Sequence, residues 1–279
     1  MALKRIIVAA SGGTASDGAI ETACRIAKRV GAGLEAFHVK LDPAQIIGLA
    51  ADGYNMPISG DWIEKMIADT DKLAETTKSA FAAAAGRHGL AVPGDASFRA
   101  ETGYAPVLVA HRARYFDLVV LGRSERVVER PHTDTIEETL VRSGRPVLLA
   151  PASAPDKIGT RIAVGWNGSA EAVHAVTFAL PLLEKAESVT VVTVGEAPDD
   201  DPTALMEYLK AHGVAATHRQ VAPVAGVGAG EQVLAEARDA DADLLVIGAY
   251  GHATWRELLF GGATRHVIGA SLLPVLLAH

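Results

Sequence analysis

The sequence has one cysteine, no excess of positive charge and no long apolar run, and each absence excludes a class of protein. Cys24 is alone among 279 residues, so no internal disulfide or cysteine-based zinc or redox site can form. Lys and Arg number 26 against 33 Asp and Glu, a formal charge of −7, whereas nucleic-acid binding needs a basic face. No uncharged apolar stretch reaches about 18 residues, so we predict no membrane span.

Signatures of catalysis and of export are also missing. No G-x-S-x-G elbow follows a predicted strand, and no two of the ten histidines form a pair of the H-E-x-x-H kind. We therefore predict no hydrolase triad and no dedicated metal site. The N-terminal segment lacks the apolar core of a signal peptide, which makes the cytoplasm the expected location. At roughly 150 residues per domain, the length predicts about two domains.

The chain repeats itself. Three blocks recur in the same order: Arg5–Gly13 as Arg161–Ser169, Asp117–Gly122 as Asp243–Gly248, and Pro146–Ala150 letter for letter as Pro274–Ala278. A segment rich in Pro, Ala and Ser, near Pro151–Gly159, separates the two copies. The pattern indicates a tandem duplication, with domains at 1–153 and 158–279.

Each half alternates short apolar runs with longer helical patterns. In the second half we predict strands at Arg161–Trp166, Ser188–Val194, Ala216–Val221, Asp243–Gly248 and Pro274–Leu277. We predict helices between them at Ser169–Lys185, Pro202–His212, Gly230–Ala240 and Gly262–Gly269. Strands without polar alternation are typical of a parallel sheet buried on both faces. The fold class is therefore α/β, with two tandem doubly wound, Rossmann-like parallel sheets whose ligands bind after the first and fourth strands.

The halves differ in length between the second and third strands. Residues Leu41–Asp95 separate these strands in the first half, where the second half has about twenty residues. The extra portion includes Ile46–Pro57, an apolar segment broken by glycine and proline. We interpret the insertion as a loop that packs on its own or the sister domain. A lid or a partner-docking surface is the alternative.

A glycine-punctuated loop follows the fourth strand of the second half. It reads Gly248-Ala249-Tyr250-Gly251, then nine residues, then Gly261-Gly262-Ala263-Thr264-Arg265. Glycine allows a ligand to approach the backbone closely, and free N–H groups at a helix start favour anions. The loop is thus a candidate phosphate site, and a plain structural turn is the alternative.

The spacing G-x2-G-x9-G, after a D-x4-G strand and before a Pro-Val-Leu strand, resembles the universal stress protein family. The turn Asn167-Gly168-Ser169 is similar to that family's Asp-Gly-Ser turn, and the resemblance covers nearly the whole chain as two copies. It implies two domains of the adenine nucleotide alpha hydrolase-like fold and a regulatory role in stress response. It also implies an intramolecular pseudo-dimer, leaves a further homodimer open, and in one subclass implies ATP binding.

By position, the resemblance implies a single ATP site in the second half, for ATP alone or with Mg²⁺. The phosphates would lie on Gly248, Gly251, Gly261, Gly262, Ala263 and Thr264, with Tyr250 in the same loop. The base and ribose would lie against Gly165, Trp166, Asn167 and Val194. Two residues depart from the family pattern: Asn167 replaces an aspartate, and Gly262 replaces a serine or threonine. Any catalysis would be at most slow ATP hydrolysis.

The first half lacks the same pattern. Glu125 replaces the second glycine, and Thr133 and Asp134 align with Gly261 and Gly262. Asp134–Glu137 reads as a helix capping box, and its carboxylates would repel a polyphosphate. We therefore expect a degenerate ATP site there.

Other features leave alternatives open. His38 and His252 are pocket candidates, although a core or surface role fits each, and Cys24 reads as a buried structural thiol. Ser11–Ser16 resembles the loop of N-type ATP pyrophosphatases but has Ala15 where that loop has aspartate. The rival to a nucleotide-binding regulator is a small-ligand or protein-interaction module of the same fold, without nucleotide.

Overall fold

The computed structural model describes residues 2–43, 60–123, 130–195, 202–249 and 273–279 of the chain, with the side chains of 130–133 left out. The first half contains β1 (Arg5–Ala9), α1 (Thr14–Val30), β2 (Gly33–Lys40), α3 (Gly60–Arg87), β3 (Ala96–Thr102), α4 (Ala105–Ala113), β4 (Leu118–Gly122), α5 (Arg130–Arg142) and β5 (Val147–Ala150). The second half contains β6 (Arg161–Gly165), α6 (Ala170–Leu183), β7 (Ser188–Val194), α7 (Pro202–Ala211), β8 (Ala216–Val221), α8 (Ala229–Asp239), β9 (Leu244–Gly248) and β10 (Val275–Ala278).

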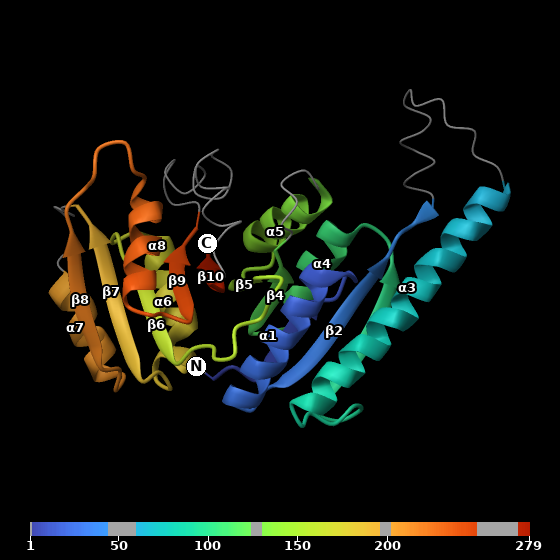
Figure 1. Ribbon diagram of the computed structural model, residues 1–279, viewed down its shortest axis with the longest axis horizontal. Coiled ribbons are helices and arrows are strands. Elements are labelled where there is room, and N and C mark those ends of the chain that lie inside the picture. Colours follow the sequence, from blue (N-terminus) through green and yellow to red (C-terminus); the bar gives the residue numbers. More distant parts are fainter. Residues whose placement is uncertain (1, 44–59, 124–129, 196–201, 250–272) are drawn as a thin grey trace.

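The strands form one ten-stranded sheet in the order β3-β2-β1-β4-β5-β10-β9-β6-β7-β8. All neighbours are parallel except β5 and β10, which pair antiparallel with Leu148 opposite Leu276 (Figure 1). Each half therefore repeats the same strand order, and β5 and β10 cover each other's edges. The predicted α/β class with parallel, doubly wound sheets is confirmed.

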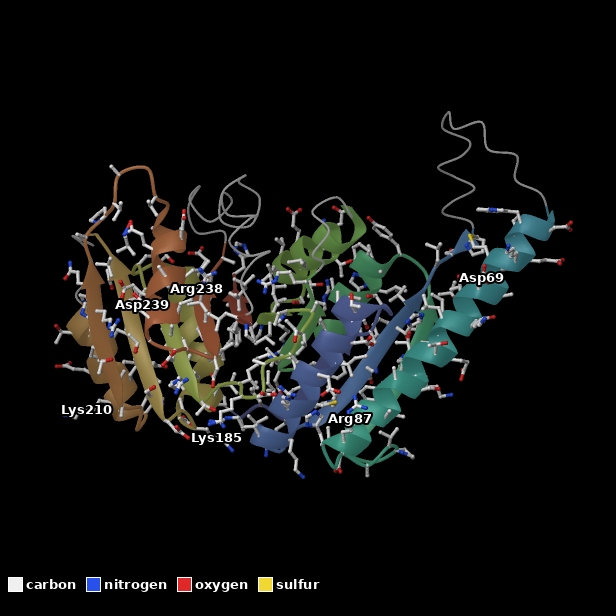
Figure 2. All side chains as sticks on the ribbon, in the orientation of Figure 1. Asp69, Arg87, Lys185, Lys210, Arg238 and Asp239 are labelled. Atoms are coloured by element: carbon white, nitrogen blue, oxygen red, sulfur yellow. The ribbon has the colours of Figure 1, made fainter. Side chains whose placement is uncertain are left out.

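Helices cover both faces of the sheet. Helices α1, α3, α6 and α7 pack on one face, and α4, α5 and α8 pack on the other. Side chains alternate between these faces along each strand, so Ile162 and Val164 lie under α6 while Ala163 lies under the opposite layer. Figure 2 shows charged side chains on the outside, and the six that it labels are all exposed. No helix among the described residues is long and apolar enough to cross a membrane.

The predicted elements of the second half agree with the structure. The strands Ser188–Val194 and Ala216–Val221 have the predicted bounds; β6 and β9 differ by one residue at one end, and β10 by one residue at each end. The predicted helix Gly262–Gly269 lies outside the described residues. Cys24 is fully buried on α1, as predicted, and burial raises the pKa of its thiol to about 12.

The interpretation of the insertion as a loop is wrong for residues 60–87, which form the 28-residue helix α3. Its C-terminal half buries Ala74, Thr77, Phe81, Ala84 and Ala85 at helical spacing against the rest of the first half. Its N-terminal turns extend beyond the end of β2 (Figure 1). The whole apolar segment Ile46–Pro57 belongs to the stretch 44–59, which lies outside the described residues.

Candidate functional site

The strand order places one switch point in each half, at the carboxyl ends of β1 and β4 and of β6 and β9. Neighbouring connections leave for opposite sides of the sheet at such points, which opens a crevice where ligands bind. The sequence analysis predicts a ligand site at these positions, after the first and fourth strands of each half.

Gly165 and Val194 lie on the same face at the second switch point. Gly165 ends β6, in register with Val192 of β7 and Ile247 of β9. Val194 ends β7 and packs against the cluster under α8. A β-carbon on Gly165 would lie 2.9 Å from Ile247 Cγ2 and 3.1 Å from Val233 Cγ1. The side chains of Ile247 and Val233 thus already fill the space beside Gly165. The half-buried Val194, at the end of β7, is the more accessible of the two predicted residues.

Trp166 follows directly but faces the other way. Its side chain is 8% exposed and belongs to the cluster under α6. Its backbone N–H donates to the carbonyl of Val192 at 2.9 Å. A ligand on the α8 face would therefore meet the backbone at Trp166 rather than the indole ring. The structure does not bring this side chain together with Gly165 and Val194.

Asn167 takes part in a turn that caps α6. Its Oδ1 accepts a hydrogen bond from the N–H of Ser169 at 3.2 Å, and Ser169 Oγ accepts one from the N–H of Ala172 at 3.2 Å. Gly168, with φ of 73°, supplies the left-handed residue between them. Asn167 is exposed just after the carboxyl end of β6.

Gly248 has a packing role that the sequence analysis did not anticipate. A β-carbon there would lie 2.5 Å from the backbone nitrogen of Ala172 and 2.6 Å from the carbonyl carbon of Glu171. In the first half, a β-carbon on Gly122 would clash with the carbonyl of Ala15. In both halves the fourth strand thus ends directly against the first turn of the helix that follows the first strand. This contact accounts for both glycines without a ligand.

The remaining predicted site residues lie outside the described residues: Tyr250, Gly251, Gly261, Gly262, Ala263 and Thr264. His252 and Arg265 lie there too. The described residues therefore include the part of the predicted site assigned to the base and ribose, and Gly248 from the part assigned to the phosphates. Among the described residues, no group of three or more His, Cys, Asp or Glu side chains is placed to hold a metal ion.

The first switch point contains a cavity of about 200 Å³ that sequence reasoning missed. It lies between the sheet, α4 and α5, and Phe37, Val109, Leu121 and Ile136 line it together with Ser11, two residues after β1. The only sequence signal was the apolar Ile136, which aligns with Thr264 of the second half.

The predicted capping box at Asp134 is wrong. Helix α5 begins at Arg130, so Asp134 lies in the second turn and not at the N-cap. From that position onward, the backbone N–H groups bond to carbonyls four residues earlier. They are satisfied within the helix and are not available to a phosphate.

His38 lies in the core and not in the cavity. It is 1% exposed, stacks on Phe98 at a centroid distance of 6.3 Å and donates from Nδ1 to the carbonyl of Ala10 at 2.6 Å. Burial lowers the pKa of its imidazole, with a smaller contribution from the charge of Lys40. Of the two roles left open for this residue, the structure supports the core role.

This burial predicts a loss of stability in acid. An unfolded histidine titrates near pH 6.5, so below that pH the unfolded chain binds a proton at His38 that the folded chain resists. The free energy of unfolding should therefore fall by about 1 kcal/mol more between pH 7.5 and 5.5 in the native chain than in His38→Gln. Urea unfolding at both pH values measures this difference, and equal losses in the two proteins would contradict it.

Comparisons with known proteins agree with this architecture. The family model of the universal stress protein family matches residues 160–279. A universal stress protein of Synechocystis is 27% identical over 174 residues, which are 58% of this chain and 57% of that relative. Residues 160–279 thus match the universal stress protein family. The match to the curated relative spans little more than half of the relative's length.

Solved structures extend the likeness in fold to the whole chain. A universal stress protein from Archaeoglobus fulgidus matches with a TM-score of 0.70 at 16% identity, covering 98% of this chain and 95% of its own. A protein of unknown function from Pseudomonas aeruginosa matches with a TM-score of 0.51 at 15% identity, covering 99% and 92% of the two chains. At these identities the likeness concerns the fold alone.

Proposed function

We propose that this chain is a stress-response regulatory module that binds one adenine nucleotide, ATP alone or with Mg²⁺, in its second half. The observation that supports this most is where the family model matches: residues 160–279 contain the whole G-x2-G-x9-G spacing. The first half has Glu125 in place of the second glycine. The proposal includes a cytoplasmic location and at most slow hydrolysis.

The described residues fit the base end of a nucleotide in part. Val194 offers a half-buried apolar surface at the end of β7, and Asn167 an exposed amide at the end of β6. Because Val233 and Ile247 already pack on Gly165, the base would rest outside that glycine, toward Val194. The N–H groups of Gly251, Gly261, Gly262 and Ala263 and the hydroxyl of Thr264 would bind the phosphates.

We also propose that 1–153 and 158–279 are separate domains that form a pseudo-dimer within one chain. The repeated strand order supports this division, because each half contains a complete five-stranded doubly wound sheet. The antiparallel pairing of β5 with β10 supports the pseudo-dimer, since it relates the two halves through equivalent edge strands.

Nucleotide binding is tested on freshly purified full-length protein. We expect denaturation to release about one ATP or ADP per chain, and Gly261→Asp to lose it, because a carboxylate at a phosphate-binding position repels the ligand. Thr133→Asp, the aligned change in the first half, is the matched control and should retain the nucleotide. Absence of released nucleotide together with no calorimetric binding of Mg-ATP would overturn the proposal.

A further inference from the structure

The cavity at the first switch point has the features of a ligand site of another kind. It opens at the carboxyl ends of β1 and β4, where doubly wound sheets bind ligands, and it is walled mainly by apolar side chains of β2, α4, β4 and α5. We propose that it binds a compact, uncharged, mainly apolar molecule of about one substituted aromatic ring.

The volume sets the size of the ligand. An apolar cavity of about 150 Å³ is enough to bind benzene, so about 200 Å³ holds a single ring with a small substituent. A small residue helps to create the space, since the side chain of Ala9 faces the same side of the sheet and a larger one there would fill the cavity. Phe37, 1% exposed, and Val109, 2% exposed, are fixed by core packing and give the cavity rigid walls.

The charges exclude an anion. Among the residues that the structure describes, none that lines the cavity is ionisable, and the lining side chains with polar atoms are the hydroxyls Ser11 and Thr135. Asp134 and Glu137 flank the lining residues of α5, so a carboxylate or phosphate entering here would meet negative charge. An ion would also lose its hydration without a lining cation to replace it.

The backbone excludes a phosphate for a second reason. In the second half the phosphates are assigned to a helix start, but in the first half α5 extends back to Arg130. The N–H groups of Thr135 and Ile136 are inside the helix and already bonded. Ile136 adds an apolar side chain where the second half has Thr264. The same switch point therefore suits apolar contact, with Ser11 at the mouth available for one hydrogen bond.

The test uses 4-fluorophenol, an uncharged ring with one hydroxyl, followed by ¹⁹F NMR on the full-length protein. We expect saturable binding that weakens at least tenfold in Ala105→Phe, which places a ring in the cavity from the start of α4. Val107→Phe is the matched control, because Val107 lies on the same helix, is 37% exposed and does not line the cavity. Val39→Phe, from β2, fills the same space if Ala105→Phe does not fold.

Two further ligands decide the chemical class and separate this site from the nucleotide site. At neutral pH, 4-fluorobenzoate should bind at least tenfold more weakly than 4-fluorophenol, and excess Mg-ATP should not displace 4-fluorophenol. Nucleotide released from Ala105→Phe should equal that from the native chain, whichever amount the native chain contains. Absence of saturable binding, unchanged binding in the cavity-filling variants, equal binding of the benzoate, or displacement by Mg-ATP would overturn the proposal.

Discussion

Replacing Gly248 by valine should destabilise the folded chain by more than about 3 kcal/mol, with or without nucleotide. The β-carbon would lie 2.5 Å from the nitrogen of Ala172 and 2.6 Å from the carbonyl carbon of Glu171. Both are backbone atoms in the first turn of α6, so no side-chain rotation relieves the clash, and α6 would have to lift from the sheet. Urea unfolding, followed by far-ultraviolet circular dichroism, measures the loss.

Two matched substitutions separate packing from ligand binding. Gly122→Val should cause a similar loss, because Gly122 ends β4 against Ala15 in the same way, although we expect no nucleotide in that half. Gly86→Ala should be neutral or stabilise the chain by up to about 1 kcal/mol, since Gly86 lies within α3 and nothing lies within 4 Å of an added β-carbon. A Gly248→Val protein as stable as the native chain would contradict the packing role.

The same glycine shows what the sequence alone can reveal and what it cannot. Runs such as Ser188–Val194 predict parallel strands reliably, because a strand buried on both faces must be apolar throughout. The spacing of the glycines predicts where the backbone has no room for a β-carbon. It does not distinguish a ligand from a neighbouring backbone, since both require the space of a missing β-carbon. Only the position of α6 against β9 provides that distinction.

Two other outcomes have similar causes. The orientation of Trp166 follows the two-residue alternation of β6, in which Ile162, Val164 and Trp166 share a face, so this face could have been predicted. The cavity in the first half could not have been predicted from the sequence, because it depends on how closely α4 and α5 approach the sheet. Helix α3 was missed because the insertion was judged by Ile46–Pro57, which glycine and proline interrupt, while the helical spacing of Phe81, Ala84 and Ala85 was present in the sequence.

The aspartate of the D-x4-G motif should also stabilise the fold. The Asp243 carboxylate accepts hydrogen bonds from the N–H of Thr160 at 2.9 and 3.1 Å and from that of Arg161 at 3.2 Å. The Asp117 carboxylate accepts them from Lys4 at 2.8 Å and Arg5 at 2.9 Å. In each half, therefore, the residue before the fourth strand holds the backbone at the start of the first strand.

We expect Asp243→Ala and Asp117→Ala each to lower the free energy of unfolding by about 2 kcal/mol, because hydrogen bonds to a charged group contribute about 1.5–3 kcal/mol. Three strand spacings, roughly 14 Å, separate β4 from β9, so the double variant should lose about 4 kcal/mol. The corresponding asparagine variants keep one acceptor oxygen and should lose less. Urea unfolding of both single variants and the double variant measures these terms.

Equal losses at Asp117 and Asp243 would have a consequence for the whole motif. The fold would then require both the aspartate and the glycine of the motif in each half, whether or not that half contains the proposed nucleotide site. The motif could persist in the first half after the glycines for phosphate were lost, leaving its switch point free to take a different ligand. A loss at Asp243 without a matching loss at Asp117 would contradict this account and would tie the motif to the second half alone.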